Sequence, residues 1–338
     1  MKAVALTRYL PIDHPESLLD VDLETPVATG RDLLIEVKAV SVNPVDHKVR
    51  APKDRVEPVA KVLGWDVAGV VKAVGSDVTL FKVGDRVYYA GSITRPGCNS
   101  ELHLVDERIV GRMPKSLGFA QAAALPLTTL TAWEALFHRL GVAKDGADAG
   151  KAVLIIGGAG GVGSIAIQLA KQLAKLRVIA TASRPQSAQW ARQLGADDII
   201  DHNQPLSDQL VRLGVPEVDY ILCFNNVDQH FAAFAGIIKP QGKIGIIVGT
   251  DNLLPLGGLM SKSVTVVWEL MFTRAMFNTP DMIAQHQLLN EAADLIDRGI
   301  VKTTLAENFG PITAANLKRA HKTLEEGHAI GKIVLEGF

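Results

Sequence analysis

One hexapeptide decides the fold of this 338-residue chain: Gly158-Ala159-Gly160-Gly161-Val162-Gly163. Its spacing, G-x-G-x-x-G, is typical of a turn that binds a dinucleotide where a strand passes into a helix. The apolar run 152–156 precedes it and predicts a buried strand. Apolar residues at three- and four-residue steps from 162 to 173 predict a helix with one buried face. This context favours a dinucleotide-binding turn over a flexible glycine loop.

Each glycine of the motif has a separate expected role. Gly158 allows the tight turn, Gly160 lets the backbone approach the pyrophosphate, and Gly163 lets the helix pack closely on the strand. The phosphates then meet the positive end of the helix. We therefore predict that the whole hexapeptide, including Ala159, Gly161 and Val162, binds the cofactor.

The pattern of predicted strands and helices differs on the two sides of residue 150, which predicts two domains. Beyond it, six apolar runs alternate with helical stretches, which is typical of a doubly wound parallel sheet: 152–156, 177–182, 198–201, 218–224, 243–248 and 263–270. Before it, short β-type runs at 33–40, 68–74, 86–89 and 100–105 favour an antiparallel, barrel-like body. A helix over 281–298 and a strand over 332–335 are expected to return to that first domain.

The end of the second strand of the sheet predicts which dinucleotide binds. An NAD-binding protein usually places an acidic residue there, against the ribose hydroxyls. Here the sequence is Thr181-Ala182-Ser183-Arg184, and residues 151–196 contain no acidic residue. Because Arg184 can bind a 2′-phosphate, the sequence predicts NADPH rather than NADH. The alternative is that Arg184 is a solvated turn residue.

Other predicted cofactor-binding residues follow further strands. The ends of the fourth and fifth strands face the cofactor crevice of a doubly wound sheet. The predicted set is completed by Ser183, His202, Phe224, Asn225, Val248, Gly249 and Lys332.

Composition limits the function classes. With 48% hydrophobic residues, 21% charged residues and a net charge of −1, the chain is expected to be a soluble globular protein. No block of basic residues suggests a nucleic-acid partner, and no apolar run approaches the roughly 20 residues of a membrane span. Residues 1–6 are expected to form a strand rather than a secretion signal, so the protein is expected to be cytoplasmic. Two cysteines, Cys98 and Cys223, provide neither a disulfide framework nor a C-x-x-C pair.

Several segments together resemble a known family along nearly the whole chain. They are Ser41-Val42-Asn43-Pro44-Val45-Asp46, Leu63-Gly64-Trp65-Asp66-Val67-Ala68-Gly69, Val83-Gly84-Asp85-Arg86-Val87, Leu130-Thr131-Ala132-Trp133 and Gly331-Lys332-Ile333-Val334-Leu335. The chain resembles the medium-chain dehydrogenase/reductase superfamily, in particular its zinc-independent quinone oxidoreductase branch. Within it, the chain is similar to bacterial zinc-type alcohol dehydrogenase-like proteins.

This resemblance implies an architecture. It places a GroES-like β-barrel catalytic domain at 1–124, a Rossmann NADP(H)-binding domain at 125–270 and a C-terminal return to the catalytic domain at 271–338. It also implies a homodimer in which the strand over 263–270 pairs between subunits, so that exposed sheet edges cover each other.

The resemblance also shows which positions would hold zinc. A catalytic zinc site needs three protein ligands of Cys, His, Asp or Glu type plus an open position. The positions that align with zinc ligands hold Asn43, Trp65, Asp66 and Leu127, so one possible ligand of four remains. The structural zinc lobe needs four cysteines, and the chain has two. We therefore expect no native metal site.

Without a metal, the expected reaction is hydride transfer to an acceptor that delocalises the added charge: a quinone or an α,β-unsaturated carbonyl compound. A Tyr-x-x-x-Lys pair is also missing. The resemblance places Asn43 and Thr131 near the nicotinamide. Around the substrate it places Asp46, His47, Lys48 and Tyr89, with Trp268 and Phe272 as a roof. For each residue a purely structural role is the alternative, and Lys48 stands where relatives often carry Tyr.

Two other functions stay open at this point. One is a protein that binds NADPH without catalysis, and the other is a zinc-type alcohol dehydrogenase. Consumption of NADPH with a quinone or an enone separates the first from an enzyme, and metal analysis tests the second.

Overall fold

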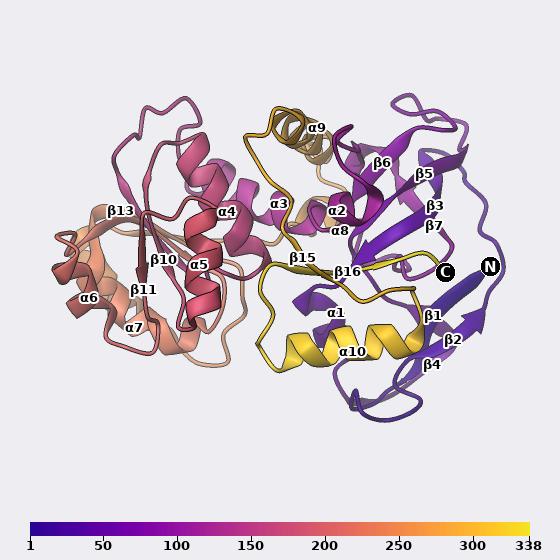
Figure 1. Cartoon of the computed structure of the whole chain (residues 1–338), viewed down its shortest axis with the longest axis horizontal. Coiled ribbons are helices and arrows are strands. Elements are labelled where there is room, and N and C mark those ends of the chain that lie inside the picture. Colours follow the sequence, from indigo (N-terminus) through magenta and orange to yellow (C-terminus); the bar gives the residue numbers. More distant parts are fainter. The chain divides into compact units, whose positions relative to one another are not determined.

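A computed structural model describes residues 1–338 and divides them into two compact units (Figure 1). The first unit combines Met1–Leu127 with Phe272–Phe338, and the second is Thr128–Met271. The chain thus leaves its first unit once and returns to it. The predicted α/β class, a mainly antiparallel body with a doubly wound parallel sheet, is confirmed.

The second unit is built on a six-stranded sheet in the order β11-β10-β9-β12-β13-β14, and all of its pairings are parallel. Its strands are β9 (Ala152–Ile156), β10 (Arg177–Thr181), β11 (Asp198–Ile200), β12 (Val218–Cys223), β13 (Ile238–Ile246) and β14 (Thr265–Trp268). Every residue of β9 is buried, as expected for a central strand covered on both faces. Because β9 lies between β10 and β12, the strand order reverses beside it, and ligands of such sheets bind at this point.

Helices cover both faces of this sheet. They are α4 (Gly161–Gln172), α5 (Pro185–Gln193), α6 (Leu206–Arg212) and α7 (Val227–Ile237). On one face, Leu154 and Ile156 of β9 share a core with Phe231 and Phe234 of α7. Helix α4 packs against β9 and β10 and buries the predicted apolar stripe. The period of the sequence therefore predicted the buried face of α4 correctly.

The first unit contains a seven-stranded sheet in the order β15-β16-β3-β5-β6-β8, with β7 also paired to β3, and a three-stranded sheet in the order β2-β1-β4. The strands of the larger sheet are β3 (Asp32–Ser41), β5 (Val67–Val74), β6 (Arg86–Tyr89), β7 (Leu102–Asp106), β8 (Gly111–Arg112), β15 (Leu305–Asn308) and β16 (Lys332–Glu336). Those of the smaller sheet are β1 (Lys2–Tyr9), β2 (Leu19–Asp22) and β4 (Lys53–Val62). Alternate residues of β3 are fully buried, which is the pattern of a strand with one face on a core.

The C-terminal segment closes the first unit. Strand β16 pairs antiparallel with β3, with Val334 opposite Ser41. The helices of this unit and the short helical segments of the chain are α1 (Pro44–Arg50), η1 (Glu107–Ile109), α2 (Phe119–Ala123), α3 (Pro126–Trp133), η2 (Glu134–Arg139), η3 (Leu256–Lys262), α8 (Thr273–Phe277), α9 (Ala284–Asp297) and α10 (Ala314–Glu325). The pairing of β16 with β3 places Lys332 beside the start of α1.

Strand β4 was missed by the sequence reasoning. Its ten residues include Lys53, Asp54, Arg55 and Pro58, and almost all of them are exposed or half-buried. It is an edge strand that pairs only with β1, so it needs no alternation of apolar side chains. No helix of the structure is long and apolar enough to cross a bilayer.

Candidate functional site

The turn between β9 and α4 is shaped so that side chains are impossible at two of its glycines. A Cβ added at Gly163 would lie 2.2 Å from the carbonyl oxygen of Gly157, and one at Gly158 would lie 2.7 Å from the Cβ of Ala180. Both contacts are far shorter than real carbon contacts, so close packing requires glycine at these positions. These are the roles that the motif predicts for the tight turn and for the approach of helix to strand.

Gly160 differs, because the protein itself does not need a glycine there. An added Cβ would meet only the carbonyl oxygen of Gly157, at an ordinary 3.5 Å. Gly160 is the N-cap of α4, a helix of 12 residues whose first-turn N–H groups have no acceptor within the helix. The turn therefore leaves backbone donors and the positive end of a helix open to an anionic ligand, and a pyrophosphate fits this arrangement.

Most of the other predicted cofactor-binding residues follow the carboxyl ends of parallel strands of the same sheet. Ser183 and Arg184 come after β10, His202 after β11, Phe224 and Asn225 after β12, and Val248 and Gly249 after β13. Because the strands are parallel, these ends lie at one edge of the sheet, together with the glycine turn. The side chain of Asn225 lies against this turn, 3.0 Å from where a Cβ of Gly157 would be.

Arg184 stands at a second helix start. It is the half-buried N-cap of α5, a helix of nine residues. Its neighbour Ser183 is exposed. Arg184 thus carries its guanidinium at the positive end of α5, and both features favour binding of an additional phosphate.

A pair of histidines lies at the end of β11. The rings of His202 and His230 meet edge to face, 6.4 Å apart, and the buried Nδ1 of His202 has no hydrogen-bond partner. Burial lowers the pKa of His230, and the charge of His202 lowers it further. The His230 ring is therefore expected to be neutral at pH 7.

In the first unit, the positions that align with zinc ligands do come together, around a lysine. The ammonium of Lys332 donates to the carbonyl oxygen of Val42 at 2.7 Å, to Asn43 Oδ1 at 2.5 Å and forms an ion pair with Asp66 Oδ2 at 3.1 Å. Asp66 accepts from Asn43 Nδ2 at 2.8 Å and from the backbone N–H of Leu127 at 2.8 Å. We call the residues Asn43, Asp46, Asp66 and Lys332 the Asn43 cluster.

The Asn43 cluster satisfies its own polar groups almost completely. The amide of Asn43 donates to Asp66 and to the carbonyl oxygens of Trp65 and Ser41, at 2.8, 3.3 and 3.4 Å. Asn43 and Lys332 are 1% and 3% exposed. Their donors are therefore used inside the unit, and the predicted contacts of Asn43 with the nicotinamide and of Lys332 with the cofactor stay predictions.

Asp46 is the member of the cluster with a buried polar atom that makes no hydrogen bond. Its Oδ2 accepts from the backbone N–H of Asn43 at 2.5 Å, while its buried Oδ1 has no partner. Burial raises the pKa of Asp46 to about 7, against the influence of the Asn43 N–H and the Lys332 charge. A proton on Asp46 near neutral pH follows from this geometry.

Tyr89 is also bonded internally. Its hydroxyl donates to His103 Nδ1 at 2.8 Å, and His103 Nε2 donates to the carbonyl oxygen of Pro96 at 3.0 Å. The two rings are stacked and buried. Burial raises the pKa of Tyr89 well above its usual value and lowers that of His103 to about 4. The pair is thus neutral, and Tyr89 lies in a wall rather than at an open surface.

Three other predicted site residues lie on helices. Lys48 is exposed on α1, one turn after the Asn43 cluster begins. Thr131 lies in α3, in the part that belongs to the second unit, and is 5% exposed. His47 is half-buried on α1, and burial lowers its pKa.

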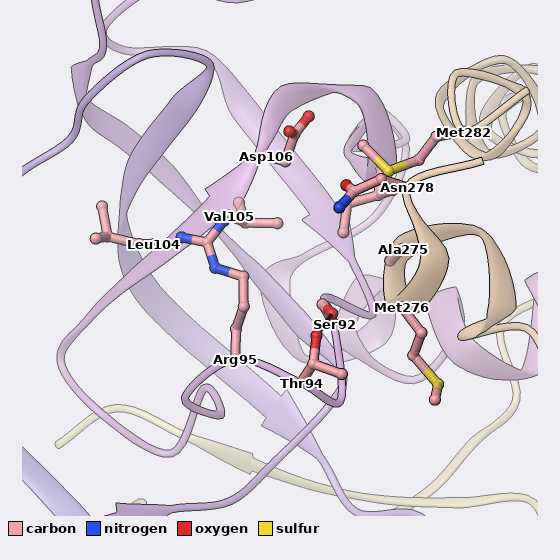
Figure 2. Close-up of a pocket in the computed structure, with 11 residues that line it drawn as sticks. Ser92, Thr94, Arg95, Leu104, Val105, Asp106, Ala275, Met276, Asn278 and Met282 are labelled. Atoms are coloured by element: carbon pink, nitrogen blue, oxygen red, sulfur yellow. Dashed lines mark hydrogen bonds between the residues drawn. The ribbon is translucent and has the colours of Figure 1, made fainter. Parts of the chain in front are cut away.

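A cavity of about 290 Å³ lies in the first unit and was not predicted from the sequence. We call it the α8 cavity, because α8 and the residues after it form one wall (Figure 2). The loop after β6 and the end of β7 form the others. Residues 92–109 and residues 275–282 contribute, two regions far apart in the chain, so no local motif could reveal it. Its wall is linked to the Asn43 cluster, since the indole N–H of Trp65 donates to the carbonyl oxygen of Ser92 at 3.2 Å.

The fold and the glycine turn define a class: two-unit oxidoreductases with a dinucleotide-binding parallel sheet. Two family models match the chain, an alcohol dehydrogenase GroES-like domain over residues 29–133 and a zinc-binding dehydrogenase over residues 194–335. The chain belongs to the medium-chain dehydrogenase/reductase superfamily, whose members use nicotinamide cofactors.

Two relatives cover nearly the whole chain. A zinc-type alcohol dehydrogenase-like protein of Staphylococcus epidermidis is 38% identical over 99% of both chains. A 2-methylene-furan-3-one reductase of Solanum lycopersicum is 32% identical over 99% of this chain and 79% of its own length. The predicted resemblance is therefore confirmed at the level of the family.

Solved structures agree with this assignment. A protein of Rhizobium etli assigned as a zinc-dependent alcohol dehydrogenase is 52% identical, with a TM-score of 0.95 over 100% of this chain and 98% of its own. The quinone oxidoreductase of Escherichia coli in complex with NADPH is 26% identical, with a TM-score of 0.83 over 99% and 100% of the two chains.

The zinc named for these relatives does not fit this chain. Asn43, Trp65 and Leu127 offer no metal-binding side chain of Cys, His, Asp or Glu type, and Asp66 is already paired with Lys332. No group of three or more such residues anywhere in the structure could hold a metal ion. No reaction step is therefore assigned to a metal.

Proposed function

We propose that this chain is an NADPH-dependent reductase of quinones or α,β-unsaturated carbonyl compounds and that it works without a metal. The observation that carries the proposal is the glycine turn at Gly158–Gly163, which leaves helix donors open and excludes side chains by contacts of 2.2 and 2.7 Å. Such a turn, at the reversal of strand order, suits the pyrophosphate of a dinucleotide.

The preference for NADPH rests on the end of β10. Arg184 is the N-cap of α5, and no acidic residue lies between 151 and 196 to accept bonds from a free ribose diol. A hydrogen bond between a guanidinium and a phosphate stabilises a complex by about 1.5–3 kcal/mol, or roughly 10 to 100-fold in affinity.

The class of acceptor follows from the absence of side chains that could hold a Lewis-acid metal. A bound NADPH supplies a hydride, which carries two electrons. With a quinone, the hydride and one proton from water give the hydroquinone; with an enone, they give the saturated carbonyl compound. In both cases the added charge is delocalised over the acceptor, so neutral hydrogen-bond donors are sufficient to stabilise it. An alcohol would need a Lewis acid, for which this chain has no ligand set.

The names of two similar proteins support this choice. One relative is a reductase of 2-methylene-furan-3-one, and one structural neighbour is a quinone oxidoreductase with NADPH bound. The substrate of the present chain is proposed by analogy with them and from its own residues.

The test combines binding and turnover. For wild type, we expect tighter binding of NADPH than of NADH and consumption of NADPH with 9,10-phenanthrenequinone. Arg184→Ala should weaken NADPH binding about 10 to 100-fold and leave NADH binding nearly unchanged. The matched control is Arg192→Ala, an exposed arginine in the last turn of the same helix. Equal affinities of the wild type for the two dinucleotides would contradict the NADPH assignment.

Turnover separates the enzyme from its alternatives. Tight binding without NADPH consumption across a broad panel of quinones and enones would indicate a dinucleotide-binding protein that is not a reductase. One zinc per chain in protein purified without added zinc, together with alcohol oxidation, would indicate a zinc-type alcohol dehydrogenase.

We also propose that the protein is a homodimer joined through β14. This strand is the edge of the parallel sheet, and its neighbourhood exposes apolar side chains: Trp268 is 50% exposed, Leu270 50% and Met260 81%. An uncovered apolar edge favours pairing with a second copy. Sedimentation should show a dimer for wild type and a monomer for Trp268→Asp, whereas Val211→Asp, at an exposed valine of α6, should stay dimeric. A monomeric wild type at micromolar concentration would contradict this.

A further inference from the structure

We propose that the α8 cavity binds the acceptor, and that it selects an uncharged, flat carbonyl compound of one or two fused rings. This inference rests on the proposed function and names the substrate class of that reductase. Its four supporting observations are the size of the cavity, the apolar side chains on two of its sides, its internally paired charges and the hydrogen-bond donors that remain available to a ligand.

The size of the cavity limits the ligand. Its volume of about 290 Å³ is at the lower end of the roughly 300–1,000 Å³ of small-molecule sites. Leu104 and Val105 line one side, and Met276 and Met282 line the α8 side (Figure 2). Ile109 also lines the cavity. Thioether groups adapt in shape and make favourable contacts with aromatic rings. A compact aromatic ligand suits these walls.

The charged residues of the cavity are neutralised by partners in the same unit. Arg95 forms a two-pronged ion pair with Asp32, at 2.7 and 2.9 Å. Asp106 is bonded by the guanidinium of Arg108 at 2.9 and 2.7 Å. Since a carboxylate and a guanidinium both line the cavity and both are paired, a charged ligand would lose water without gaining a partner. The lining therefore favours an uncharged molecule.

Hydrogen-bond donors stand on two sides of the cavity. The hydroxyls of Ser92 and Thr94 lie 3.0 Å apart and bond to each other, which leaves one of their two hydrogen atoms for a ligand. The exposed side-chain amide of Asn278 makes no hydrogen bond to another residue. Figure 2 shows this amide on the α8 side and the two hydroxyls on the loop after β6. Two separated donors suit a molecule with two carbonyl oxygens, such as a quinone.

Contacts within the unit connect the cavity lining with Tyr89 and Phe272, two side chains that the sequence placed around the substrate. His103, which holds the hydroxyl of Tyr89, is bonded to Pro96 of the same loop. Phe272, directly before α8, meets the ring of Trp65 edge to face at 6.2 Å. Because the Trp65 indole is bonded to Ser92, its fluorescence can report directly on occupancy of the cavity.

The first measurement is therefore binding without turnover. Quenching of tryptophan fluorescence by 1,4-naphthoquinone is recorded without NADPH, and Trp65→Phe identifies the part of the signal that comes from Trp65. Ala275→Phe fills the cavity and should weaken naphthoquinone binding at least about tenfold. Asn278→Gly keeps the left-handed backbone of this residue, with φ of +46°, and should weaken binding about two- to tenfold through loss of one neutral hydrogen bond.

Matched controls exclude general effects of the substitutions. Ala233→Phe adds the same ring to an exposed alanine of α7, and Gln241→Gly removes an exposed amide from another left-handed position, with φ of +62°. Both should bind naphthoquinone like the wild type. Unfolding temperatures of all variants confirm that they fold, and NADPH affinity should change less than twofold in each.

A charged analogue tests the ligand class. The sulfonate derivative of 1,4-naphthoquinone should bind at least about tenfold more weakly than the uncharged ring. Stronger binding of the sulfonate would show that Arg95 attracts anions and would overturn the uncharged class.

The outcomes separate this inference from the proposed function. If NADPH is consumed with naphthoquinone but Ala275→Phe and Asn278→Gly change neither the dissociation constant nor KM, the acceptor binds elsewhere and the inference fails alone. If the variants weaken quinone binding as expected but no acceptor is reduced, the site stands and the proposed reductase fails.

Discussion

The glycine turn of the second unit and the Asn43 cluster of the first unit treat their polar groups in opposite ways. The turn leaves the first N–H groups of α4 without acceptors in the helix, and close packing excludes side chains at Gly158 and Gly163. The Asn43 cluster closes on itself: all three donors of Lys332 and both amide hydrogens of Asn43 face protein acceptors. The donors of the glycine turn are therefore available to a ligand, whereas the bonds of the Asn43 cluster stabilise the first unit.

The largest expected effect on stability follows from breaking the Asn43 cluster. Lys332→Met should destabilise the first unit by about 3–5 kcal/mol, because Asp66 then remains buried and unpaired. The double variant Asp66→Asn/Lys332→Met should regain part of this loss. Chemical denaturation, followed by circular dichroism, measures both free energies of unfolding.

A lysine at the surface provides the control for that experiment. Lys239→Met breaks an ion pair with Asp219 in which the lysine side chain is 45% exposed, and its cost should stay below about 1 kcal/mol. If Lys332→Met were no more damaging than Lys239→Met, the cluster would not have the structural role described above. The NADPH affinity of the double variant reports separately on the predicted contact of Lys332 with the cofactor.

A single added methyl group should distort the glycine turn and weaken cofactor binding. Gly163→Ala places a Cβ against the carbonyl oxygen of Gly157, so the turn must move, at about 1–3 kcal/mol of stability. Displacement of the helix donors should weaken NADPH binding at least about 100-fold, the lower limit for loss of two charge-assisted hydrogen bonds. Titration calorimetry measures the affinity.

Gly236 in α7 is the matched helical glycine. Nothing lies within 4 Å of a Cβ added there, so Gly236→Ala should stabilise the protein by about 0.5–1 kcal/mol and leave NADPH binding unchanged. Similar effects of the two substitutions would mean that the turn has no special geometry.

The stability of the Asn43 cluster should also depend on pH. The pKa of Asp46 is raised from 3.8 to about 7 in the folded protein, so the unfolded chain releases the proton first as pH rises. Stability from this group is complete below pH 4 and is lost progressively up to pH 7. Asp46→Asn, which resembles the protonated acid, should match wild type near pH 4 and become progressively more stable than wild type as the pH rises to about 7. Parallel melting curves of the two proteins at all pH values would contradict the buried, protonated Asp46.

The same contrast explains what could be predicted from the sequence. The turn, its strand and α4 are contiguous, and their period of apolar residues is visible in one segment of about 20 residues. The residues after β10, β12 and β13 were predictable because parallel strands bring their carboxyl ends to one edge. Fold class and much of the second unit thus follow from local patterns.

The first unit was less predictable because its contacts are long-range. Lys332 meets Asn43 across 289 residues, and no local pattern predicts that its ammonium binds there. Edge strand β4 lacks an apolar alternation, and the α8 cavity combines residues 92–109 with the distant residues 275–282. Tyr89 was expected at the substrate, yet its hydroxyl is bonded to His103 inside the wall.

The most direct test of the account is a titration of the wild-type protein with NADPH and with NADH, followed by calorimetry and by the unfolding temperature. The account predicts one NADPH site per chain, weaker binding of NADH, and an unfolding temperature that rises with NADPH concentration. If neither dinucleotide releases heat or shifts the unfolding temperature, the open turn at Gly158–Gly163 does not hold a dinucleotide, and the proposed reductase is wrong.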